Sequence, residues 1–73
     1  MLISVAACKQ GEKLIIATVK TSNDTILHKM AVFGILPGAE CRILQTRPAF
    51  VLQVGHTLLA VDRIIAGTIY GYK

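Results

Sequence analysis

The chain has 73 residues, of which 53% are hydrophobic and 16% charged, and its formal net charge is +4 at pH 7. A chain this short folds only if it is rich in apolar side chains or is stapled by disulfides or metal, and this composition provides the first. It excludes a disordered chain, a disulfide scaffold and a spanning segment of about 20 apolar residues, while the scattered basic residues do not form the stripe typical of nucleic-acid binders.

The first clear element is residues 13–20, a β-branched run between two lysines that predicts a strand buried on most of both faces. Residues 9–12 before it have the composition of a turn. Residues 21–25 combine loop and helix-capping types, and Asp24 is expected to act as a cap. Four side chains are of a type that can cap the helix that follows: Ser22, Asn23, Asp24 and Thr25.

A short amphipathic helix is predicted next. Ile26, Met30 and Phe33 recur at i, i+4 and i+7 and form one apolar stripe. Gly34 stands where a left-handed C-terminal cap belongs. Residues 35–38, Ile-Leu-Pro-Gly, then predict a tight turn back toward a strand.

The remaining chain predicts short strands joined by tight turns. The expected elements are strands at 39–46, 48–54, 58–61 and 66–72, a hairpin turn at 55–57 and a single helical turn at 62–65. Five to six short strands with one inserted helix and a late helical turn predict a small, mostly β, antiparallel barrel formed by one domain, residues 1–73. We expect the barrel to close, because open edges of such apolar strands aggregate.

The segment 29–38, Lys-Met-Ala-Val-Phe-Gly-Ile-Leu-Pro-Gly, resembles the signature of the ferrous iron transport protein A (FeoA) domain. The opening segment 5–12 and the closing segment 59–69 are also similar to that family, so the resemblance covers nearly the whole chain. Two departures are an acidic Asp62 where the family has a basic residue, and a shortened stretch at 48–50. The same module looks like the C-terminal domain of some iron-dependent repressors.

The resemblance implies an SH3-like barrel in the cytoplasm that has no enzymatic activity and acts on FeoB, the iron permease, through the permease's cytosolic part. It implies contact with the membrane only through that permease. The absence of a secretory leader pattern and the two cysteines, expected to be free thiols, also favour the reducing cytosol.

Catalytic chemistry is not expected. The carboxylates have structural explanations as turn or cap residues: Glu12, Asp24, Glu40 and Asp62. Cys41 alternates with exposed residues and is expected in the core, where a thiol is not a nucleophile. No glycine-rich phosphate loop is present.

The candidate metal ligands show no close spacing, so we expect no resident metal or other cofactor. These ligands are Cys8, Cys41, His28 and His56. A bound transition metal stays open as an alternative, with Cys41 and His56 as the pair to test, as does a metal-sensing module related to the repressors. A small RNA-binding barrel of the SH3 or Sm type is the other alternative, although no nucleic-acid partner is expected. It would use Phe50, Tyr70 and Tyr72 beside Arg47 and Lys73.

Protein binding is the function that the composition favours most. One helical stripe can pack on the barrel, which leaves apolar side chains on and after the helix for a partner. The expected surface consists of Lys29, Ala31, Val32, Ile35, Leu36, Arg42 and Arg63. The alternative is that both sides of the helix pack within the domain. Self-association through an unpaired strand edge is a further hypothesis.

Overall fold

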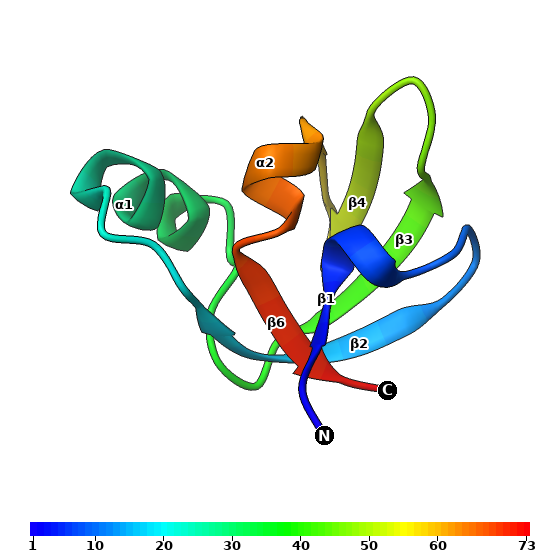
Figure 1. The fold of residues 1–73 in the computed structure, drawn as a ribbon, viewed down its shortest axis with the longest axis horizontal. Helices are drawn as coiled ribbons and strands as arrows, with labels where there is room; N and C mark the ends of the chain where they lie inside the picture. The colour runs from blue at the N-terminus through cyan, green and yellow to red at the C-terminus, as the bar shows by residue number, and fades with distance from the viewer.

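The computed structural model describes all 73 residues as a curled sheet with two helices and one 3-10 turn (Figure 1). In chain order the elements are β1 (Ile3–Ser4), η1 (Val5–Ala7), β2 (Lys13–Val19), α1 (Asp24–Val32), β3 (Glu40–Gln45), β4 (Phe50–Val54), β5 (Thr57–Val61), α2 (Arg63–Ala66) and β6 (Ile69–Tyr72). Short strands, one inserted helix and a late helical turn are the fold class that the sequence predicts.

The six strands form one antiparallel sheet in the order β1-β6-β2-β3-β4-β5. β1 pairs with β6, which brings the two chain ends together, while α1 lies at a distance from them (Figure 1). The sheet curls as expected, but backbone pairing does not close it, because β1 and β5 are both edges. The helical turns η1 and α2 contact each other across this gap instead.

The core consists of inward-facing aliphatic side chains with no buried polar or charged residue. In β4, Phe50, Leu52 and Val54 are buried and alternate with half-buried neighbours. β2 differs from the sequence prediction, because Leu14 and Ile16 are buried whereas Ile15 is exposed. The side chains of a strand alternate between the two faces of the sheet, so only one face of β2 meets the core.

Helix α1 begins earlier than the apolar stripe indicated. Asn23, not Asp24, is the N-cap, and its Oδ1 accepts hydrogen bonds from the N–H groups of Thr25 and Ile26 at 2.9 and 3.2 Å. Asp24 is the first helical residue, where its negative charge suits the positive end of the helix dipole.

The C-terminus of α1 is a Schellman motif. The N–H of Gly34 donates to Ala31 and the N–H of Ile35 donates to Met30, at 3.0 and 2.9 Å. Gly34 has φ +89°, the left-handed conformation that the sequence predicts. The expected burial of Phe33 is wrong, because the helix ends before it and Ile35 packs with Met30 in its place.

The corner between α1 and β3 is a type II turn of residues 36–39. Pro37 and Gly38 occupy its central positions, Gly38 has φ +91°, and the N–H of Ala39 donates to Leu36 at 3.0 Å. Two further bonds join the corner to β2: Gly38 N–H donates to Ile16, and Ile16 N–H donates to Ala39, both at 2.8 Å. The turn is therefore held against the sheet.

Three other boundaries differ from the predictions. β4 begins at Phe50 rather than Pro48, and β5 begins at Thr57, so the hairpin loop is only Gly55 and His56. The last strand begins at Ile69, because residues up to Ala66 belong to α2. Asp62 caps that helical turn as expected, accepting the Ile65 N–H at 2.8 Å.

Candidate partner-binding groove

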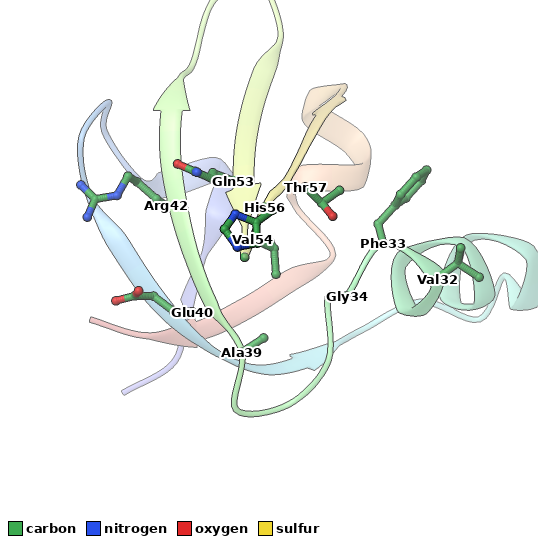
Figure 2. Close-up of a pocket in the computed structure, with 11 residues that line it drawn as sticks. Val32, Phe33, Gly34, Ala39, Glu40, Arg42, Gln53, Val54, His56 and Thr57 are labelled. Carbon is green, nitrogen blue, oxygen red and sulfur yellow. The ribbon is translucent and has the colours of Figure 1, made fainter.

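A surface groove of about 790 Å³ lies between the end of α1 and the β3-β4-β5 side of the barrel (Figure 2). The residues that line it come from the α1 corner and from the three strands and their hairpin: Val32, Phe33, Gly34, Ala39, Glu40, Arg42, Gln53, Val54, Gly55, His56 and Thr57. The Schellman motif and the type II turn described above position the first wall. The β4-β5 hairpin forms the second.

The α1 wall presents exposed apolar side chains on a fixed backbone. Val32 is 68% exposed, and Phe33 extends from the helix end on the side of the hairpin (Figure 2). Leu36, 48% exposed, lies three residues beyond Phe33 at the start of the type II turn. Since Met30 and Ile35 of the same corner are buried, this surface is held in place from beneath.

The β-strand wall is more polar. Arg42 of β3 lies directly opposite Gln53 of β4, and Cys41 opposite Val54, so the first pair faces outward and the second inward. Glu40 and Arg42 project from the same side of β3 (Figure 2). The groove therefore joins an apolar end at α1 to a polar end on the sheet.

The charges at the groove leave one cation without an acidic partner. Glu40 is paired with Lys13 of β2 at 3.4 Å, whereas Arg42 forms no ion pair. The other ion pair of the structure, Lys73 with Glu12 at 2.6 Å, lies away from the groove. The polar end is therefore suited to an acidic group.

The structure separates the residues expected at the partner surface. Val32 and Arg42 line the groove. Lys29 and Leu36 are exposed but do not line it, and Ala31 is half-buried. The expected exposure of Ile35 is wrong: it is only 2% exposed, because the Schellman motif turns it into the core.

Arg63 does not line the groove. It belongs to α2, and its guanidinium lies over the ring of Phe50 at 5.6 Å from the ring centroid. A cation–π contact of this kind holds the guanidinium against the barrel. Of the three basic residues that the sequence predicted for the rim, Lys29, Arg42 and Arg63, only Arg42 lines the groove.

Sequence reasoning missed Phe33 and the hairpin side of the groove, formed by Gln53, His56 and Thr57. Phe33 directly precedes Gly34, and that position offered a signal, because the residue before a left-handed capping glycine is the C-cap, which has already left helical geometry. No local signal places the hairpin beside α1, since the two segments meet only through the sheet.

The two cysteines are buried, free thiols. Burial raises the pKa of Cys41 to about 11, with a smaller contribution from Cys8, and burial likewise raises the pKa of Cys8. His56 is exposed in the hairpin loop, whereas Cys41 points into the core, so this pair does not form a ligand set. No group of three or more His, Cys, Asp or Glu side chains is placed to hold a metal ion.

The aromatic residues do not form one stacking platform. Phe50 is buried, Tyr72 is exposed, and Tyr70 is half-buried with the Lys20 ammonium 5.0 Å from its ring centroid. An RNA-binding barrel needs exposed rings that follow one another beside basic residues. This arrangement gives that alternative little support.

The carboxylates are spread over the surface. Glu12 pairs with Lys73 and also accepts the Lys9 N–H at 2.6 Å, and these two interactions hold the pKa of its carboxyl below the usual value, the first more than the second. Glu40 pairs with Lys13, and Asp62 caps α2. No helix of the chain has the length and apolar character needed to span a bilayer.

Solved structures share the whole architecture. An iron uptake regulatory protein (FeoA) is 22% identical, with a TM-score of 0.87 over 99% of this chain and 97% of that one. The zinc-complexed FeoA of Stenotrophomonas maltophilia, described as a prokaryotic SH3 domain protein, is 20% identical, with a TM-score of 0.82 over 92% and 86%. At these identities the likeness establishes the fold, an SH3-like barrel.

A manganese-dependent transcriptional repressor in complex with manganese is also similar, at 17% identity and a TM-score of 0.91. It matches 99% of this chain, which spans only 36% of that repressor. No curated protein sequence matches this chain. Residues 3–73, however, match the FeoA domain model, and the chain therefore belongs to the FeoA family.

Proposed function

We propose that this domain is a cytoplasmic accessory protein that docks on the cytosolic part of a FeoB-type iron permease and modulates transport by binding alone. Membership of the FeoA family supports the link to ferrous iron transport. The family is an accessory family of transport and not a known class of enzyme, which supports a function by binding alone.

The observation that carries it is the apolar surface of Val32, Phe33 and Leu36 at the anchored end of α1. Apolar side chains exposed on a fixed backbone lose little conformational entropy when a partner covers them. Apolar side chains make up much of the fully buried core of an interface, where aromatic residues such as Phe33 are enriched. Arg42 at the other end of the groove adds an attraction for acidic groups.

The expected mechanism is a shift in the permease's conformational equilibrium. A bound domain favours whichever permease state offers the better-fitting surface, in proportion to its differential affinity for the two states. No chemistry by this domain is required, and its buried, protonated thiols take no part.

The test is binding to the isolated cytosolic part of a FeoB-type permease, measured by biolayer interferometry. The double variant Val32→Glu, Leu36→Glu is expected to weaken binding at least about tenfold, because it places charges in the apolar contact. The matched control is Ile64→Glu on α2, which alters an apolar residue that is 80% exposed and outside the groove.

The proposal fails if the wild-type domain does not bind, or if Ile64→Glu weakens binding as much as the groove variant. Arg42→Ala isolates the electrostatic contribution to binding, because it should lower the association rate and make that rate less dependent on salt. Tight binding to RNA oligomers that falls steeply with salt would support the rival function instead.

A further inference from the structure

The free edge of β5 is the strongest feature that the groove does not explain. β5 pairs with β4 on one side and has no backbone hydrogen bond to any other element. In the two-residue hairpin, Val54 lies opposite Thr57 and Leu52 opposite Leu59, which makes these the hydrogen-bonded pairs. The N–H and C=O groups between them, those of Leu58 and Ala60, therefore point to the open edge.

The β5 strand itself carries no charge, proline or bulge that would discourage pairing. Proteins discourage the pairing of edges with charges, proline, bulges or very short strands. β5 is five residues long, Thr-Leu-Leu-Ala-Val, and pairs with β4 without any shift in register. The other edge, β1, has only two residues and is protected by its length.

We propose that two copies of this chain associate through antiparallel pairing of their β5 strands. The pairing that fits places Leu58 of one copy opposite Ala60 of the other, with a two-fold axis at Leu59. Both outward-pointing residues of each strand then exchange N–H···O bonds with the other copy. A second copy can supply partners for these N–H and C=O groups, because a two-fold axis brings the same strand edge of each copy together.

The side chains agree with the same register. Leu58 is 62% exposed and Ala60 is exposed on the same outer face, where Val51 of β4 lies opposite Ala60. In the pair, the Leu58 side chains of the two copies become diagonal neighbours, within reach of each other across the axis. Apolar surface that is open to water in one copy is thereby covered.

The residues that flank the strand are also complementary. The register sets His56 of one copy opposite Asp62 of the other. Asp62 uses one carboxylate oxygen to cap α2, at 2.8 Å from the Ile65 N–H, which leaves the second oxygen free to accept an imidazole N–H. No like charges oppose each other along the pairing.

Analytical ultracentrifugation of the isolated chain tests the proposal without any permease. Because the interface is small, the weight-average mass should rise toward twice the monomer value only between roughly 10 µM and 1 mM. Amide hydrogen exchange should show protection at Leu58 and Ala60 that increases with concentration, while protection at Leu59, already bonded to β4, is unchanged.

Ala60→Pro removes one outward N–H and no internal bond, so it is expected to keep the fold and raise the dissociation constant at least about tenfold. Leu58→Lys provides a second test that leaves the backbone intact, because two lysines would meet at the axis. Ile64→Lys, exposed on α2, is the matched control and should associate as the wild type does.

A chain that stays monomeric at 1 mM would overturn the proposal. So would association that Ala60→Pro and Leu58→Lys leave unchanged, or that leaves Leu58 and Ala60 unprotected. None of these outcomes bears on binding to the permease, since the proposed docking surface at Val32 and Leu36 is altered by neither variant.

Discussion

The two walls of the groove are built in different ways. The α1 wall rests on buried Met30 and Ile35, and its turn is bonded both to itself and to β2. The hairpin wall ends in Gly55 and His56, which are exposed and form the loop that leads into β5, a strand that pairs on one side only. A small barrel can therefore present a rigid apolar surface beside an open strand edge.

The largest expected effect on the free energy of unfolding tests the buried side chain beneath the α1 wall. Met30→Ala should lower the free energy of unfolding by about 2–5 kcal/mol, because it leaves a cavity beneath the corner. Val32→Ala, two residues on and exposed, should change it by less than about 0.5 kcal/mol. Urea denaturation followed by circular dichroism measures both, and equal losses would show that the wall is not anchored from beneath.

A glycine at each wall allows a direct comparison of their rigidity. Gly34→Ala should lower the free energy of unfolding by about 1–2 kcal/mol, because φ +89° is strained for alanine and the corner is bonded in place. Gly55→Ala is also strained, because Gly55 has φ +60°, but its loss should be the smaller of the two, because the exposed two-residue loop can relax into another turn. A larger loss at Gly55 would reverse the assignment of rigid and pliant walls.

The far end of α1 shows whether the helix as a whole supports the groove. Asn23→Ala removes the cap that accepts two backbone N–H groups and should cost about 1 kcal/mol. Fraying should stay in the first turn, so exchange of the Gly34 and Ile35 amides should change only as global stability does. Selective loss of protection at these two amides would mean that the corner depends on the whole helix.

The smallest expected effect on the free energy of unfolding at neutral pH comes from the ionisation of Cys41, a core residue opposite Val54 of the groove. Burial raises its pKa from 9.0 to about 11, so the folded state keeps a proton that the unfolded state loses between these values. The free energy of unfolding should therefore be unaffected below about pH 8 and should fall as pH rises from 9 toward 11. Cys41→Ala should reduce this slope. The slope that remains should come from Cys8 and, above about pH 10.5, from Lys73, whose pKa is raised by its pairing with Glu12. An unchanged slope would mean that the Cys41 thiol is not buried in solution.

Much of the fold was predictable because its signals are local. The cap at Gly34 and the turn at Pro37-Gly38 follow from backbone geometry that few other residues adopt, and the strands follow from period-two alternation. The predictions were wrong where a neighbour far along the chain determines whether a side chain is buried. The sequence predicts β2 as buried on both faces, but the curled sheet encloses only one of them. Ile35, not Phe33, packs with Met30 in the core.

The candidate site was only partly predictable for the same reason. Val32, Leu36 and Arg42 could be named as exposed from their positions in the helix, turn and strand. The opposite wall could not, because nothing near His56 in the sequence indicates that α1 stands across from it. Gly71 is a similar case: a side chain there would overlap the backbone of Ile15, a contact created only when β6 pairs with β2.

By itself, the sequence determined that this is one small β-rich domain with an inserted helix, where that helix ends, and which family signature the corner carries. The tertiary structure decided which aliphatic residues became core and which became surface, that the sheet has an open edge at β5, and that α1 faces the hairpin. The physical reason is range: caps and turns are set by bonds within a few residues, whereas burial and open edges depend on which strands meet.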